Sequence, residues 1–147
     1  MFNQKNYVID AATGLIKRAL GSAAVTSTAA YVGTQHDQGA AVATDVVCVI
    51  DVEAIDIAST DEVYTFRLVA SNVADRSDST VIAMGQIGDA STISATETID
   101  GAAGHRLVLF GRTEKNGTAY RYLDLHLTAD GTTESITFGA YISKVLV

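Results

Sequence analysis

Apolar and polar residues alternate along much of the chain after residue 44, with the period of two expected of half-buried β-strands. In the segment AYRYLDLHL, Leu123, Leu125 and Leu127 share one face, and polar or aromatic residues occupy the other. The run VVCVIDV is instead apolar on both faces, which predicts a central strand or a strand at a subunit interface. These patterns predict strands at residues 25–32, 45–57, 62–71, 80–87, 92–98, 105–113, 119–127 and 134–147.

Turn-forming residues separate the predicted strands. Asn116-Gly117 and Asp130-Gly131 stand between the last three, and both dipeptides favour the tight turns of β-hairpins. The chain is therefore predicted to end in an antiparallel meander. Eight short strands without a convincing long helix indicate an all-β sandwich or barrel. Loops are predicted at residues 33–39, 58–61, 72–79, 88–91 and 100–104.

Residues 1–24 do not follow this pattern. They contain three of the ten basic residues, and their apolar residues do not alternate. Asp10 is a candidate N-cap for a short helical turn over AATGLIKRAL, although Gly14 weakens that helix. We interpret residues 1–24 as an N-terminal arm that becomes ordered against another surface, and residues 25–147 as the β-sandwich domain.

Composition and charge narrow the partners. The 147 residues suffice for one domain with a substantial core, and 48% of them are hydrophobic. A net charge of −7 argues against nucleic-acid binding, which needs Lys and Arg to displace counterions. No apolar run approaches the roughly 18 residues of a membrane span. Lys17 and Arg18 interrupt the apolar residues where a signal peptide would be uncharged, so export by the general route is not expected.

Cysteine and histidine do not form a recognisable reactive motif. Cys48, the only cysteine, is a nucleophile, one half of an intermolecular disulfide or a small buried hydrophobe. We favour the last interpretation, because free cysteine is among the most buried residue types. His36, His105 and His126 lack the close spacing of metal ligands. We therefore predict no metal site and no cofactor.

One strand carries a polar face that resembles an acid–base site. Asp124 and His126 lie two residues apart, and Tyr120 and Tyr122 share their face. The alternative is a solvated sheet face, which we favour because no nucleophile accompanies these residues. We therefore predict no catalytic residue.

Several longer segments of the chain resemble a known family. Their most specific part is the Arg-Tyr-Leu-x-Leu core that begins at Arg121, together with the late strands. Residues 20–147 are similar to the capsid cement, or decoration, proteins of tailed bacteriophages, of the small jelly-roll type. The segments that carry the similarity are AVTSTAAYVG (24–33), DVVCVIDVEAI (45–55), DEVYTFRLVASNVAD (61–75), STVIAMGQIGD (79–89), GHRLVLFGR (104–112), YRYLDLHLTADG (120–131) and ITFGAYISK (136–144).

The resemblance implies an antiparallel jelly-roll β-sandwich of about eight strands that acts as a non-enzymatic virion protein. Such a protein is made in the host bacterial cytoplasm, binds the major capsid protein on the outer surface of the capsid, forms a homotrimer and stabilises the head. The arm departs from the family, whose members begin close to their first strand. If it folds on docking, it adds contact area to the capsid interface. Its candidate interface residues are the apolar Phe2, Tyr7, Ile9, Leu15 and Ile16 and the basic Lys17 and Arg18.

Two rival functions remain open. A carbohydrate-binding module on a jelly roll would use exposed aromatic residues such as Tyr64, Tyr120 and Tyr122. The absence of Trp weakens this alternative. A small jelly-roll enzyme would need a convergent polar pocket, which the sequence does not provide.

Overall fold

The apolar face of each long strand is buried, and the strands reach this arrangement by forming two facing layers. The computed structural model describes residues 7–8, 15–88 and 104–145, and all regular elements in these ranges are β-strands. No apolar helix of membrane-spanning length occurs among them. The strands are β1 (Tyr7–Val8), β2 (Ile16–Arg18), β3 (Ala29–Asp37), β4 (Asp45–Ile55), β5 (Val63–Ser71), β6 (Thr80–Gly88), β7 (Arg106–Arg112), β8 (Glu114–Lys115), β9 (Thr118–Ala119), β10 (Tyr122–Asp130) and β11 (Ile136–Val145).

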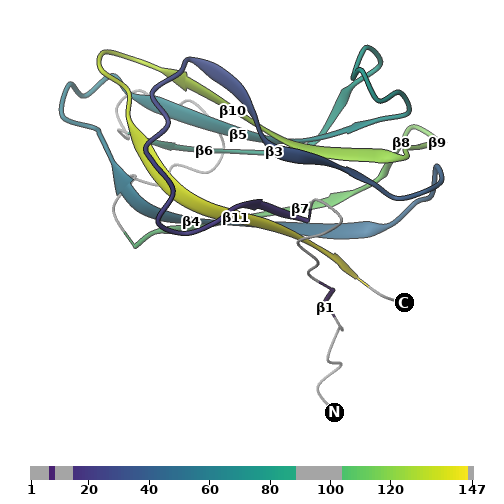
Figure 1. The fold of residues 1–147 in the computed structure, drawn as a ribbon. Coiled ribbons are helices and arrows are strands. Elements are labelled where there is room, and N and C mark those ends of the chain that lie inside the picture. The colour runs from purple at the N-terminus through teal and green to yellow at the C-terminus, as the bar shows by residue number, and fades with distance from the viewer. Residues whose placement is uncertain (1–6, 9–14, 89–103, 146–147) are drawn as a thin grey trace.

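Two antiparallel sheets form the layers (Figure 1). Sheet A has the order β2-β11-β4-β7, and β1 also pairs with β11. Sheet B has the order β3-β10-β5-β6. The chain passes from one sheet to the other between β2, β3, β4 and β5, and again between β6, β7, β10 and β11. This order is that of a jelly-roll β-sandwich, so the predicted fold class is confirmed.

The core lies between the sheets and contains side chains from both. Cys48 and Ile50 of β4 are fully buried, as are Leu123 and Leu125 of β10. Phe66 of β5 meets the ring of Phe138 of β11 edge to face, with the ring centroids 5.1 Å apart. Because β5 belongs to sheet B and β11 to sheet A, this contact joins the layers. The predicted alternation of β10 and the central position of β4 are both confirmed.

The predicted meander is wrong. The Asn116-Gly117 turn does form, with positive φ at both residues (54° and 79°), but it joins the short strands β8 and β9. The longer strands β7, β10 and β11 are consecutive in sequence, yet β10 lies in the sheet opposite to the other two. Each of these strands has one apolar face, and packing of the two sheets against each other buries these faces. Turn residues determine the local reversal, whereas burial determines which strands pair.

The predicted helical turn is wrong over residues 16–18, and the predicted loop at 33–39 is wrong as far as residue 37. Residues 16–18 form β2, because β11 offers an edge to which they can hydrogen-bond. Leu15 is 1% exposed and belongs to the core. The sandwich therefore begins before residue 25, and β3 continues to Asp37. The predicted strand at 92–98 lies outside the described residues.

Gly33 permits the close approach of β2 to β3. Its φ is +70°, and a Cβ at this position would lie 2.2 Å from the backbone oxygen of Lys17. Gly117 also has a positive φ (+79°), but nothing lies within 4 Å of a Cβ there. Substitution at Gly117 therefore introduces only an unfavourable backbone conformation, whereas substitution at Gly33 also introduces a clash with the backbone of Lys17.

We predict that Gly33→Ala lowers the free energy of unfolding by at least about 1 kcal/mol more than Gly117→Ala does. Both variants carry the left-handed penalty of about 1–2 kcal/mol, and only Gly33→Ala adds the clash. Urea denaturation of the two variants and the wild type measures the difference. Equal losses would show that the β2–β3 contact does not constrain the backbone.

Candidate functional site

A buried lysine fills an irregularity in sheet B. Lys17 of β2 is only 4% exposed, and its Nζ donates to the backbone oxygens of Thr34 (2.6 Å) and Leu123 (3.2 Å). The register between β3 and β10 shifts between Leu123 and Leu125, so the regular ladder is interrupted here. The ammonium group therefore donates to two backbone oxygens, from β3 and β10, beside this irregularity. Burial lowers the pKa of Lys17 to about 8, although the charge of Asp124 opposes this shift.

The carboxylate of Asp124 is the centre of a polar cluster on sheet B. Asp124 is 2% exposed and accepts hydrogen bonds from Gln35 Nε2 (2.8 Å), Arg76 Nε (3.0 Å) and Arg76 Nη2 (3.2 Å). The Arg76 guanidinium lies over the ring of Tyr31, 4.3 Å from its centroid, and the Tyr31 ring meets His126 edge to face. Both oxygens of Asp124 are thus committed to internal donors. The prediction of a solvated face is wrong at Asp124, because these donors cover it.

The buried cysteine and the three histidines do not come together in a reactive or metal-binding cluster within the described residues. Cys48 is fully buried, and burial raises the pKa of its thiol to about 12, so the interpretation as a buried hydrophobe is confirmed. His36 lies on β3, His126 on β10 and His105 just before β7. Within the described ranges, no three His, Cys, Asp or Glu residues lie close enough to hold a metal ion.

The aromatic residues suggested for carbohydrate binding do not form an exposed platform. Tyr64 is fully buried; its hydroxyl donates to the backbone oxygen of Asp56 (2.7 Å) and accepts from the backbone nitrogen of Ser135 (2.9 Å). Tyr120 packs against the core, and Tyr122 is half-buried beneath Arg121. The suggestion is therefore wrong for Tyr64. The more exposed aromatic side chain on sheet B is Tyr31, at 40%.

The outer face of sheet A differs from that of sheet B because its centre is apolar. On β4, Val47 and Val49 point away from the core, since the residues between them are buried inside. Their neighbours across the ladder on β7 are Phe110 and Val108, respectively. The Phe110 side chain is 75% exposed, which is exceptional for a phenylalanine. We call these four residues the ladder patch.

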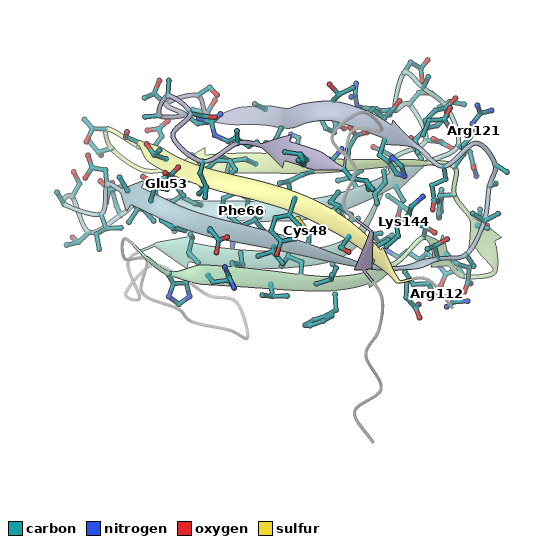
Figure 2. All side chains as sticks on the ribbon, turned by 60° about the horizontal axis from the view of Figure 1, so that its bottom comes forward. Cys48, Glu53, Phe66, Arg112, Arg121 and Lys144 are labelled. Carbon is teal, nitrogen blue, oxygen red and sulfur yellow. The ribbon has the colours of Figure 1, made fainter. Side chains whose placement is uncertain are left out.

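Ion pairs border the ladder patch at both ends. Arg112 Nη1 lies 2.8 Å from Asp45 Oδ1, and Arg106 Nε lies 2.5 Å from Asp51 Oδ1. Arg112 marks one end of this face in Figure 2, and Glu53, just beyond Asp51 on β4, marks the other. The charges of these two pairs cancel, and Glu114 Oε2 also lies 3.5 Å from Arg112 Nε. The face is therefore close to neutral in a chain of net charge −7.

A shallow apolar groove continues the face on the other side of β11. It has a volume of about 250 Å³ and includes Ile16, Leu20, Gly139 and Tyr141 in its lining. Leu20 is 64% exposed and Ile16 is 41% exposed. Leu20 lies over Gly139, where a Cβ would come within 2.7 Å of the leucine side chain. We call this feature the Leu20 groove.

The structure separates the predicted capsid-interface residues. Leu15 and Lys17 are buried, so neither is available to a partner in this fold. Ile16 is half-exposed in the Leu20 groove. Arg18 is held against the sandwich, since its Nε donates to the backbone oxygen of Phe138 (3.0 Å). Tyr7 belongs to β1, which pairs with β11, whereas Phe2 and Ile9 lie outside the described residues.

Sequence reasoning offered a subunit interface for the run that contains Val47 and Val49, but it missed Phe110 and the pairing that forms the ladder patch. The signal that could have found them is the run VVCVIDV, which is apolar on both faces. Pairing this run with β7 was not visible, because the two strands are joined only through the opposite sheet.

No family model matches the chain, and no curated protein matches it. Among solved structures, the chain is similar to the xylan-binding module CBM15, with 17% identity, 95% of each chain covered and a TM-score of 0.42. It is also similar to the CBM22-1–GH10 modules of the Clostridium thermocellum endo-1,4-beta-D-xylanase 10B, complexed with xylohexaose. That match has 13% identity, covers 97% of this chain and 28% of the other, and has a TM-score of 0.40. At these values neither similarity assigns a function.

We predict a pH-dependent effect of Lys17→Met. Below pH 8 the lysine is protonated in both the folded and the unfolded state. Between pH 8 and 10.5 the unfolded state binds more protons, so the contribution of Lys17 to stability rises with pH. The free energy of unfolding of the wild type, relative to Lys17→Met, should increase by on the order of 3 kcal/mol over this range.

Chemical denaturation of both proteins at several pH values measures this increase. Lys115→Met, at an exposed lysine, corrects for the loss of one positive charge. If the difference in the free energy of unfolding between the wild type and Lys17→Met is constant from pH 8 to 10.5, the burial of a desolvated ammonium group is contradicted.

Proposed function

We propose that this chain is a non-enzymatic decoration protein that binds the outside of a bacteriophage capsid and stabilises the head. The observation that carries the proposal is the exposed apolar surface on the outer face of sheet A. Antiparallel sheets in a two-layer domain usually present a polar face to water. Sheet B carries the Gln35–Asp124–Arg76 cluster beside the exposed Met84 and Val81 of β6. Sheet A presents Phe110 and Leu20, which are more exposed than either (75% and 64%, against 53% for Met84).

The interior supports a role that depends on contact and not on reaction. Asp124 and Lys17 are buried and hydrogen-bonded, and Cys48 is buried with a raised pKa. A general base or nucleophile must reach its substrate, and these groups are covered. Their hydrogen bonds instead hold strands together.

The capsid as partner rests on the resemblance of residues 20–147 to decoration proteins. A decoration protein holds a shell by the sum of its contact areas, which favours a rigid body with an apolar outer face. We assign the Leu20 groove to the capsid lattice. It contains Ile16, one of the interface residues predicted from the sequence, and Arg18 lies beside it.

Carbohydrate binding is a second candidate, which a different surface favours. A groove of about 380 Å³ next to β3 is lined by Tyr31, Thr26 and Ser27, among others. The Arg76 guanidinium lies over the Tyr31 ring, and the His126 ring meets it edge to face. A half-exposed, fixed aromatic ring beside hydroxyl groups suits the apolar face and hydroxyls of a sugar.

We predict that purified protein added to undecorated heads binds saturably and raises their disruption temperature, because binding to the intact shell stabilises it by mass action. Leu20→Ser should weaken binding by about tenfold, since burying a leucine contributes about 1.5–3 kcal/mol. Met84→Ser is the matched control, because Met84 is 53% exposed on β6 of the other sheet. Heads that gain neither protein nor heat resistance would contradict the proposal.

We predict that, if the second candidate is the function, a glycan array shows binding that Tyr31→Ala abolishes and Leu20→Ser leaves unchanged. The array uses the full chain, and circular dichroism checks that each variant is folded. Binding that survives Tyr31→Ala would exclude the Tyr31 groove as the glycan site.

A further inference from the structure

The ladder between β4 and β7 carries a repeating pattern on its outer face. Four outward-facing pairs follow one another along the strands, in the order charged, apolar, apolar, charged. Each charged pair joins an aspartate on β4 to an arginine on β7. The pairs are Asp45–Arg112, Val47–Phe110, Val49–Val108 and Asp51–Arg106.

This pattern is complementary to itself under one two-fold rotation. A two-fold axis that runs parallel to the strands, between β4 and β7, sets β4 of one copy against β7 of the other. Asp45 then faces the partner's Arg112, and Phe110 faces the partner's Val47. An axis across the strands would instead set Arg112 against the partner's Arg106 and repel. The register therefore favours a single arrangement.

Charge also points to a second copy as the occupant of this face. Two chains of net charge −7 repel each other over most of their surface. The two arginines and two aspartates of this face cancel, and the one further charge paired with them is Glu114, beside Arg112. Two copies therefore repel each other less here than elsewhere on their surface. A strongly acidic or basic partner would gain nothing from a neutral face, whereas paired charges with an apolar centre suit an identical face.

We propose that the ladder patch and its bordering ion pairs form the interface of a symmetric homodimer. The proposal rests on the proposed function only in leaving the Leu20 groove to the capsid; Asp51 borders both surfaces. A homotrimer, which the resemblance implies, joins different patches of neighbouring subunits and would not use a self-complementary face. The patch and its border comprise eight residues, fewer than the roughly 20–30 per partner of a standard interface, so we expect a weak dimer that forms only at high concentration.

Sedimentation equilibrium of the full chain without heads tests the proposal. The wild type should pass from monomer to dimer between about 1 and about 500 µM, as mass action requires. Phe110→Ser should raise the dissociation constant at least about tenfold, because it removes the largest exposed apolar group of the interface. Met84→Ser, at an exposed residue of sheet B, should leave the constant unchanged.

Charge exchange tests whether the bordering charges of the two copies meet across the interface. The variant Arg106→Asp/Arg112→Asp makes the border wholly acidic, and the variant Asp45→Arg/Asp51→Arg makes it wholly basic. Each alone should be monomeric, because like charges meet across the axis. An equimolar mixture should form a heterodimer. Surface ion pairs contribute little to folding, so both variants should fold, and thermal unfolding verifies this.

The outcomes separate this proposal from the proposed function. A wild-type monomer or trimer over the whole concentration range, or a mixture that does not associate, overturns the homodimer. If such a protein still binds heads, the decoration function stands without the dimer. If the protein forms the dimer but does not bind heads, the homodimer interface is supported and the proposed decoration function is contradicted.

Discussion

Burial of Cys48 and Ile50 against sheet B determines which side of β4 lies inside the sandwich. Because side chains alternate along a strand, the same burial places Val47 and Val49 on the outside. A strand that is apolar on both faces buries all its apolar side chains only if its outer face is covered too. Part of that cover comes from the neighbouring strands β7 and β11, which leave both valines 8% exposed. Phe110, at the edge of the same patch, remains exposed to solvent. The proposed function and the proposed dimer both follow from this exposed apolar surface.

The two sheets divide the work of stability and contact. On sheet B, polar groups that lie in or beside the ladder satisfy one another: Lys17 bonds the carbonyl oxygens of the irregular β3–β10 ladder, and Arg76 and Gln35 hold Asp124. A buried charge costs free energy unless it is paired and hydrogen-bonded, so these contacts are expected to be intolerant of substitution. On sheet A, the polar groups are ion pairs at the ends of an apolar centre. That arrangement resembles an interface, with an apolar middle and a polar rim.

Alternation in the sequence predicted most of the long strands, because burial on one face imposes a period of two. The run that is apolar on both faces predicted a central or interfacial strand, and β4 lies between β11 and β7 in sheet A. The sequence did not predict which strands pair. Asn116-Gly117 forms a turn, but this turn joins the short strands β8 and β9 and not the longer strands. The role of Lys17 was missed for a related reason. Its basic charge read as a surface feature, whereas the carbonyl oxygens that bind it come from strands about 17 and 106 residues away.

The central claim is that the outer face of sheet A is covered when the protein performs its function. Hydroxyl-radical labelling, read by mass spectrometry, measures the accessibility of Phe110 in the dilute chain and in the assembled state, with Met84 on sheet B as the internal reference. We expect Phe110 to lose most of its labelling on assembly while Met84 does not. Phe110 labelled to the same extent in both states would contradict the central claim.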